Sequence, residues 1–583
     1  MLQREVWDLS GLQKAFINLV SQTDSQLKIC LFIDGLDEYE GNEADIAEIF
    51  GRASISENVK ICCSSRPHQP FEDAFADRPR LRLQDRTMPD MRKYIHDKLE
   101  KSPRMQELSR SEPKETEKLI EEIAQAANGV FLWVRLVVMS LLRGLGNHDD
   151  IAHLQMRLKV LPKELDDLFD QMIFKVDEVY RQETAQIFQL VGSAYRPRSQ
   201  ETLHGAQATA QLSILLLSFA MERDAKLAVQ AEPSSFDKEK VASRCRSMEI
   251  HLRTRSGGLL EVQYGTPSTT LSPGMKISYL HRTVRDHLEK PKIRDLLERQ
   301  TTFEHKDPYH ASSAIFKAHV LILKAFHATD LTETWTLVED GLAWARRAEQ
   351  DTGTSHPALL DEFYRIAHHL WTTKRSFKTS YSPLYDFFIK QQSALTLATQ
   401  CGLDRYLDAK LPHIKKDETH TTLLNIALTP RIENDYLVNL KVVSTLLSHG
   451  ANPNARLAES PKSLWQHVLS HLNTTVSRKP EHIALLQQWA PIITMLLKSG
   501  ANPDAGCSEP QRYKTSEGRR VFDDSLWTPD EIVGRIFGSD PQRLGEVGAA
   551  LEEARLELRR KKELQGQEKA QERGTGTCCC LVQ

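Results

Sequence analysis

Residues 29–40 read Ile-Cys-Leu-Phe-Ile-Asp-Gly-Leu-Asp-Glu-Tyr-Glu, and this stretch holds the most informative pattern in the chain. An apolar run ends at Asp34, and two more acids, Asp37 and Glu38, follow it closely. A buried parallel strand has this composition when it delivers carboxylates to the carboxyl edge of a sheet. Sites for nucleoside triphosphates use such an edge: one Asp holds Mg²⁺ and a nearby acid polarises the attacking water. The pattern therefore predicts the acidic half of a nucleotide site on an α/β core.

The phosphate-binding half of such a site does not precede this strand. No Gly-x-x-x-x-Gly-Lys-Ser/Thr loop occurs before Ile29, and the single glycine there, Gly11, begins no such loop. The backbone amides and the lysine of that loop supply much of the binding energy for phosphate. The expected nucleotide affinity is therefore weak or lost, and three origins stay open: a truncated gene model, a natural fragment or a decayed homologue.

Length and composition indicate a multidomain globular protein. The 583 residues exceed what one hydrophobic core supports, so about three or four domains are expected. A net charge of −3 provides no global basic field, which argues against nucleic acid as a partner. Nine cysteines without disulfide-like spacing, and the lack of a signal peptide, predict a cytoplasmic protein.

The first hundred residues alternate strand and helix signals. Residues 43–53 have apolar side chains at helical spacing, between the strand at 29–33 and a second apolar run at 59–63. This order predicts a parallel βαβ unit, in which Cys62 and Cys63 are small core residues. Residues 81–83 are a candidate third strand.

Helices dominate from about residue 115, with one interruption. Strand-like runs at residues 259–264 and 275–280 bracket a loop rich in Gly, Pro, Ser and Thr. A helix before this hairpin predicts a winged-helix module. Residues 284–297 are expected to be helical with a break at Pro291.

Two segments near the C-terminus are similar to each other. Residues 443–455 read Val-Ser-Thr-Leu-Leu-Ser-His-Gly-Ala-Asn-Pro-Asn-Ala, and residues 493–505 read Ile-Thr-Met-Leu-Leu-Lys-Ser-Gly-Ala-Asn-Pro-Asp-Ala. Both resemble the end of an ankyrin repeat, whose usual period is about 33 residues. The larger spacing here predicts an insertion around residues 459–481, and residues 393–407 are a candidate further copy. The alternative is a generic helical pair with a shared turn.

Taken together, these segments resemble a fungal NACHT-domain protein of the NOD-like, STAND class of NTPases, in which ankyrin repeats are a common sensor. The similarity covers about residues 25–300. Residues 31–40 resemble the Walker B element, and residues 61–67 resemble the sensor 1 strand that ends in Ser-Arg-Pro. Residues 128–142 and 158–172 resemble two helical segments typical of the fungal group, and residues 277–288 resemble a His-containing motif after the wing.

The resemblance implies roles for five residues. Asp34 would hold Mg²⁺ through water, and Asp37 and Glu38 would supply the catalytic acid. Arg66 would sense the terminal phosphate, and His281 would contact a bound diphosphate and lock an inactive state. The implied cofactor is ATP or ADP with Mg²⁺, bound weakly or lost. The structural alternatives are an ion pair between Arg66 and the nearby acids, and a core or interface position for His281.

The last residues carry a separate signal. The sequence Cys580-Leu581-Val582-Gln583 fits a prenylation motif, and Cys578 and Cys579 are candidates for acylation. One lipid binds membranes only marginally, so the upstream basic residues 559–562 matter. This pattern predicts a membrane-associated form, and its alternative is a plain cysteine-rich tail.

The expected fold class is α/β followed by mostly α. We divide the chain into a partial P-loop NTPase-like core with a parallel sheet (1–105), a helical and winged-helix region (106–300), a helical linker (301–390), degenerate ankyrin-like repeats (391–540) and a charged helix with a cysteine-rich tail (541–583). The expected function is a signalling or regulatory one: a nucleotide-linked switch that recognises protein partners through its repeats, without NTPase activity of its own. The alternatives are an active NTPase that uses a phosphate loop supplied in trans, and a lipid-anchored interaction scaffold.

Overall fold

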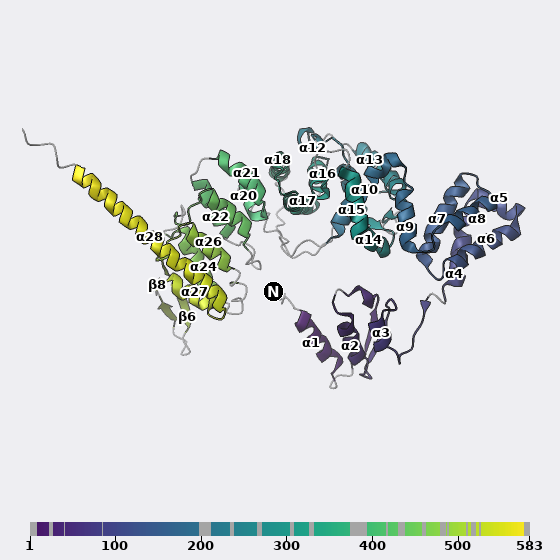
Figure 1. Cartoon of the computed structure of the whole chain (residues 1–583), viewed down its shortest axis with the longest axis horizontal. Coiled ribbons are helices and arrows are strands. Elements are labelled where there is room, and N and C mark those ends of the chain that lie inside the picture. Colours follow the sequence, from purple (N-terminus) through teal and green to yellow (C-terminus); the bar gives the residue numbers. More distant parts are fainter. Residues whose placement is uncertain are drawn as a thin grey trace, which may run out of the picture. The chain divides into compact units, whose positions relative to one another are not determined.

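The computed structural model divides the chain into two compact units, Met1–Lys163 and Glu164–Gln583 (Figure 1). The boundary expected at residues 105/106 therefore lies inside the first unit, and the five-part division stays a prediction. The structure describes residues 9–22, 27–39, 41–83, 86–196, 211–224, 226–233, 238–264, 271–302, 308–325, 331–373, 393–414, 418–428, 438–456, 462–478, 486, 489–508, 511–514, 520–523 and 526–575.

The first unit begins with the predicted βαβ arrangement. Strands β1 (Ile29–Ile33) and β2 (Val59–Cys63) pair in parallel, with Ile29 opposite Val59. Helix α2 (Glu43–Ala53) connects them, as a parallel pair requires. Its first turn is capped by the Asn42 side chain, which accepts a hydrogen bond from the backbone N–H of Ala44. The βαβ expectation is confirmed at this level.

The described part of this sheet is covered on one face, which corrects the expectation of a fully buried strand. Helices α1 (Leu9–Val20), α2 and α3 (Gln69–Ala74) pack against the face that carries Ile29 and Ile33. Side chains alternate along a strand, so Phe32 lies on the other face and is 81% exposed. Cys62 and Cys63 are exposed, not core residues, and residues 81–83 form no strand.

The rest of the first unit is helical. A turn at Asn128 and Gly129, whose φ angles are 46° and 81°, ends the helix before it. Trp133 in the following helix is 1% exposed, and its Nε1 donates to the backbone oxygen of Pro162 at 2.8 Å. The helices are α4 (Met88–Leu99), α5 (Pro103–Ser111), α6 (Pro113–Ala126), α7 (Phe131–Gly146) and α8 (Ile151–Val160).

The second unit opens with helices around a hairpin. Strands β3 (Leu260–Val262) and β4 (Ile277–Tyr279) pair antiparallel after a long helix, and the predicted break before Pro291 separates α14 from α15. The helix-then-hairpin order is confirmed. The helices are α9 (Leu165–Phe174), α10 (Arg181–Tyr195), α11 (Ile214–Ala220), α12 (Leu227–Gln230), α13 (Lys238–Arg255), α14 (Arg282–Leu288) and α15 (Pro291–Thr302), with a 3₁₀ turn at Glu178–Tyr180.

Three longer helices follow, and a buried ion pair joins two of them. They are α16 (Ala311–Ala325), α17 (Leu331–Thr352) and α18 (Pro357–Thr373). The Lys324 side chain is 0% exposed, and its Nζ lies 2.5 Å from Oε1 of Glu362. Lys324 also donates to the backbone oxygens of Val229 and Ala231 at 3.1 and 2.6 Å. Burial opposes ionisation of Glu362, but hydrogen bonds from Arg365 and Lys324 leave its pKa below the ordinary value.

The C-terminal part of the second unit is a stack of helix pairs. Consecutive pairs contact each other, so α20 packs on α22, α21 on α23, α23 on α26, α24 on α27 and α26 on α28. The preceding helices α17 and α18 pack on α20, so the stack is supported at its first pair. The pairs are α20 (Ala394–Cys401) with α21 (Asp404–Lys410), α22 (Glu418–Leu428) with α23 (Leu440–Ser448), α24 (Leu464–Arg478) with α26 (Ala490–Lys498), and α27 (Pro529–Phe537) with α28 (Pro541–Thr575).

Residues 459–481 are not an insertion between two repeats. Most of them form α24, the first helix of the third pair, whose Trp465 and Leu469 are fully buried. The long spacing between the two similar loops arises within the third pair, where α24 has 15 residues and α26 begins only at Ala490. A 3₁₀ turn (Leu411–His413) follows α21, and the short antiparallel pairs β5 (Cys507–Ser508) with β8 (Leu526–Trp527), and β6 (Gln511–Lys514) with β7 (Arg520–Asp523), precede α27.

Helix α28 is the charged helix expected after residue 540, and the first half of this helix is not fully exposed. Val547, Leu551 and Ala554 are buried, so this half packs on the stack, whereas Arg559 to Lys562 are exposed. No helix among the described residues combines the length and the apolar character needed to cross a membrane.

Glu349 is a buried carboxyl that connects α17 to the stack. Its side chain accepts a hydrogen bond from the backbone N–H of Arg405 at 3.1 Å, at the start of α21. The residue is 6% exposed, and burial raises its pKa from 4.5 to about 7. The α17–α20–α21 contact therefore contains a group that titrates near neutral pH.

We expect Glu349→Gln to flatten the pH dependence of unfolding. Between pH 4.5 and about 7 the folded chain keeps the Glu349 proton while the unfolded chain has lost it. The free energy of unfolding therefore falls as pH rises through this window, by on the order of 3 kcal/mol from this group. Urea titrations near pH 5 and pH 8 measure the difference. An equal fall in the wild type and the variant would contradict this assignment.

Candidate functional site

The carboxyl ends of β1 and β2 bring two polar residues together. Asp34 directly follows β1 and Ser64 directly follows β2, and parallel strands end at the same edge. Ser64 Oγ donates to Asp34 Oδ1 and also accepts from the Gly35 backbone N–H at 3.0 Å. Gly35 has a φ of 70°, a left-handed conformation that favours glycine. Asp34 is exposed, so its carboxylate is oriented by Ser64 and stays accessible.

Asp37 and Arg66 form an ion pair at the same edge. Asp37 and Glu38 lie in a 3₁₀ turn (Leu36–Glu38), and the Asp37 side chain is 5% exposed. Its Oδ1 accepts from the Arg66 backbone N–H at 3.0 Å, and its Oδ2 lies 3.4 Å from Arg66 Nε. This pair is the structural alternative considered for Arg66. The Arg66 side chain is still 45% exposed.

The geometry at this edge suits a hydrated cation and an anion next to it. Mg²⁺ binds through one or two carboxylates, with waters and substrate phosphates completing its shell. Asp34 would be the carboxylate and Arg66 the contact to phosphate, while Asp37 positions Arg66. Among the residues that the structure places, no cluster of three or more His, Cys, Asp or Glu side chains is arranged to hold a metal by itself.

The other predicted site residues are located elsewhere. His281 belongs to the second unit, where its Nδ1 accepts from the Thr283 backbone N–H at 3.2 Å and caps α14. It is exposed, so it is not a core histidine. The candidate lipidation residues Cys578, Cys579 and Cys580 lie outside the described residues.

The two Ala-Asn-Pro loops of the stack have the same backbone conformation. Gly450 and Gly500 have φ angles of 93° and 90°. The next residue in each loop, Ala451 or Ala501, donates its N–H to a backbone oxygen in the preceding helix at 3.0 or 2.9 Å. This is the glycine-terminated helix end that the two similar sequences predicted.

One asparagine joins the two loops. Asn454 Nδ2 donates to the Gly500 backbone oxygen at 2.6 Å, and Asn454 Oδ1 accepts from the Asn502 backbone N–H at 2.9 Å. Trp465 Nε1 donates to the Asn502 backbone oxygen at 2.9 Å. The loop after α23 therefore stacks directly on the loop after α26. The sequence comparison showed the repeated motif but not this contact.

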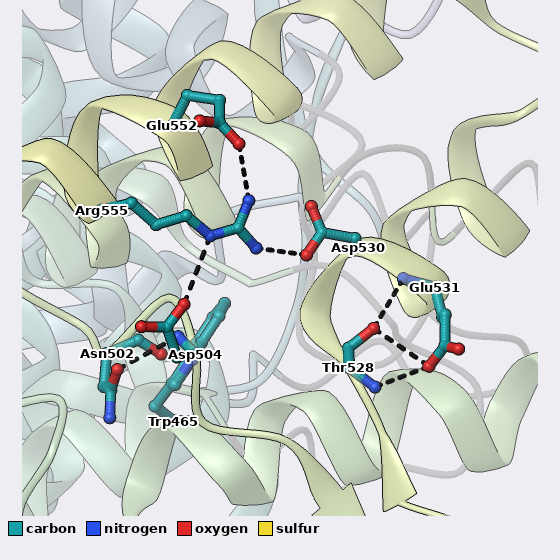
Figure 2. Close-up of polar contacts among 8 residues, drawn as sticks. All are labelled: Trp465, Asn502, Asp504, Thr528, Asp530, Glu531, Glu552 and Arg555. Carbon is teal, nitrogen blue, oxygen red and sulfur yellow. Dashed lines mark hydrogen bonds and ion pairs between the residues drawn. The ribbon is translucent and has the colours of Figure 1, made fainter.

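The equivalent position in the second loop is an acid that contacts α28. Asp504 occupies the place of Asn454, and its Oδ1 lies 3.3 Å from Arg555 Nε. Figure 2 shows Arg555 surrounded by Asp504, Asp530 and Glu552, with 2.6 Å to Glu552 Oε1. The hydrogen bonds that Arg555 donates, first to Asp530 and then to Glu552 and Asp504, raise the pKa of its guanidinium. In the sequence, the only sign of this ion pair was that the second motif has an acid, Asp504, where the first has Asn454.

The start of α27 holds Asp530 in place beside Arg555. Thr528 Oγ1 accepts from the Glu531 backbone N–H, and the Glu531 side chain accepts from the Thr528 backbone N–H at 2.8 Å (Figure 2). This reciprocal capping satisfies two backbone donors in the first turn. Asp530 is therefore presented to Arg555 from a well-formed helix end.

Comparisons with known proteins give one match. A family model described as a domain of unknown function, DUF7791, matches residues 175–334, which run from the end of α9 into α17. No curated protein and no solved structure matches this chain. The matched segment contains the β3–β4 hairpin but neither the β1–β2 edge nor the helix-pair stack.

Proposed function

We propose that this chain is a cytoplasmic regulatory protein that recognises protein partners through ankyrin-like helix pairs at residues 391–575. The observation that supports this proposal best is the loop-to-loop contact of Asn454 with Gly500 and Asn502. Stacked units of this kind form extended surfaces that bind other proteins. The NACHT-like resemblance of the N-terminal half adds a regulatory role.

Partner recognition by the stack can be tested with photo-crosslinking residues in the full chain. Lys441 on α23 and Lys498 on α26 are exposed positions on the stack, and Arg110 and Lys114 are exposed positions in the first unit. We expect defined protein crosslinks from the two stack positions and none from the two control positions. Crosslinks confined to the first unit would exclude this function for the stack.

We also propose that the β1–β2 edge is a nucleotide-linked element. Asp34, oriented by Ser64, would bind Mg²⁺, and Arg66 would face the phosphates. The proposed role is nucleotide binding alone, because hydrolysis also requires a phosphate loop, which is not among the residues of this edge. An NTPase that receives this loop in trans is the alternative.

Nucleotide binding should depend on Asp34. With Mg²⁺ present we expect a fluorescent ATP analogue to bind weakly, and Asp34→Asn to weaken it at least about tenfold, because the carboxylate is the proposed Mg²⁺ contact. Asp77→Asn, also at an exposed acid of the same unit, is the matched control. Binding that is unchanged by Asp34→Asn or by removal of Mg²⁺ would rule out the site. Mg²⁺-dependent hydrolysis lost in Asp34→Asn would favour the NTPase alternative.

The lipid-anchored scaffold is a third candidate, which rests on the motif at Cys580. The mass of the native C-terminus, compared with that of Cys580→Ser, tests it. An unmodified mass would leave no basis for membrane association.

A further inference from the structure

A groove of about 420 Å³ lies beside the two stacked loops. Its lining comes from the loops after α23 and α26, the start of α24, the end of α26 and one side of α28. The Gly500 and Asn502 backbone and the apolar side chains of Leu497 and Leu558 belong to this lining. Its volume is in the range of sites that enclose a few side chains of a ligand. The groove is therefore large enough for a short extended peptide.

The amide groups of the groove are already used within the protein. Asn454 is paired with Gly500 and Asn502, and Gln466 Nε2 donates to the Gly506 backbone oxygen at 2.9 Å. We therefore do not expect these side-chain amides to form hydrogen bonds with a ligand. The groups that remain for a ligand are the charged side chains of the lining.

Two exposed cations line the groove, Arg456 from the loop after α23 and Lys561 from α28. Within the described ranges neither side chain forms an ion pair, in contrast to Arg555 with its three acids. Lys561 belongs to a run of four exposed cations at residues 559–562, which extends the positive charge along α28. One carboxylate, Glu557, also lines the groove. The balance of charge favours an anionic ligand.

We propose that this groove binds an extended acidic segment of a protein partner. Carboxylates of the segment would pair with Arg456 and Lys561, and an apolar side chain between them would contact Leu497 and Leu558. A concave site of this size admits a single peptide chain, whereas a bilayer surface or a nucleic-acid duplex is too broad to enter it. This inference rests on the proposed partner-binding function and specifies its chemistry.

The test uses the full chain and a fluorescein-labelled Glu-Glu-Leu-Glu-Glu peptide. We expect salt-sensitive binding that the double substitution Arg456→Glu with Lys561→Glu weakens at least about tenfold, and Arg456→Gln with Lys561→Gln weakens less. Arg110→Glu with Lys114→Glu changes the net charge by the same amount at exposed sites of the first unit, and should leave binding unchanged. Both groove residues are exposed, so their replacement should not affect folding.

Three outcomes would overturn the groove proposal: no peptide binding, equal loss in the control pair, or charge-dependent binding of anionic vesicles instead of the peptide. The crosslinking experiment separates these results from a failure of the wider function. If crosslinks from Lys441 persist while the peptide does not bind, the stack still recognises partners and the groove assignment is wrong. If the stack gives no crosslinks, the wider function fails.

Discussion

Trp465→Ala is expected to lower the free energy of unfolding of the second unit by about 3–5 kcal/mol, the usual loss for a buried aromatic side chain. Trp465 is 0% exposed in α24. Its Nε1 donates a hydrogen bond to the Asn502 backbone oxygen in the loop after α26. The substitution therefore leaves a cavity and removes one of the contacts that hold the loops together. Urea unfolding followed by far-UV circular dichroism measures the loss.

Two further variants separate the stability lost to the cavity from the stability lost with the hydrogen bond. Trp465→Phe keeps most of the ring volume and removes the N–H donor, so it should lower stability by about 1–3 kcal/mol. Leu556→Ala removes an apolar side chain that is 53% exposed on α28, and should change stability by no more than about 0.5 kcal/mol. If Trp465→Ala were as mild as Leu556→Ala, the stack would not depend on this packing.

Glu362→Ala is expected to destabilise the second unit by about 3–5 kcal/mol, because it leaves the buried Lys324 ammonium without its carboxylate. The Lys324 side chain is 0% exposed and the Glu362 side chain 10%. Two backbone oxygens, of Val229 and Ala231, would remain as partners, and they carry no compensating charge. The same unfolding measurement applies.

The reverse substitution should be milder, and this asymmetry is the sharper test. Lys324→Met leaves Glu362 paired with Arg365, whose Nε and one terminal nitrogen lie 2.7 and 2.8 Å from its carboxylate. Combining Lys324→Met with Glu362→Leu replaces the pair by apolar groups and should recover stability relative to Glu362→Ala. A larger loss in Lys324→Met than in Glu362→Ala would show that the lysine contributes by its bonds to the backbone oxygens instead.

The equivalent positions of the two Ala-Asn-Pro loops form different contacts. Asn454 forms a hydrogen bond with the loop of the next helix pair, whereas Asp504, at the equivalent position, forms an ion pair with Arg555 of α28. Helix α28 packs on the stack with its first half, and its exposed basic turn at residues 559–562 lies next to the groove.

The features that the sequence predicted depend on residues that are close together along the chain. Apolar runs predicted β1 and β2, and helical spacing predicted α2. Two strand-like runs around a loop rich in Gly, Pro, Ser and Thr predicted the β3–β4 hairpin, and the repeated Ala-Asn-Pro motif predicted two similar helix ends. The placement of Asp34 after a strand also predicted an acidic sheet edge, and the structure places Asp34, Asp37 and Arg66 at that edge. Such signals act over a few residues, so they survive in a single sequence.

Other features were decided by contacts between residues far apart in the chain. The apolar run at residues 29–33 predicts coverage on both faces, but α1, α2 and α3 cover the same face and Phe32 remains exposed. The partners of Lys324, Asp504 and Trp465 lie 38, 51 and 37 residues away, at Glu362, Arg555 and Asn502. Whether a side chain is buried or paired depends on which surface folds against it, and only the tertiary structure supplies that surface.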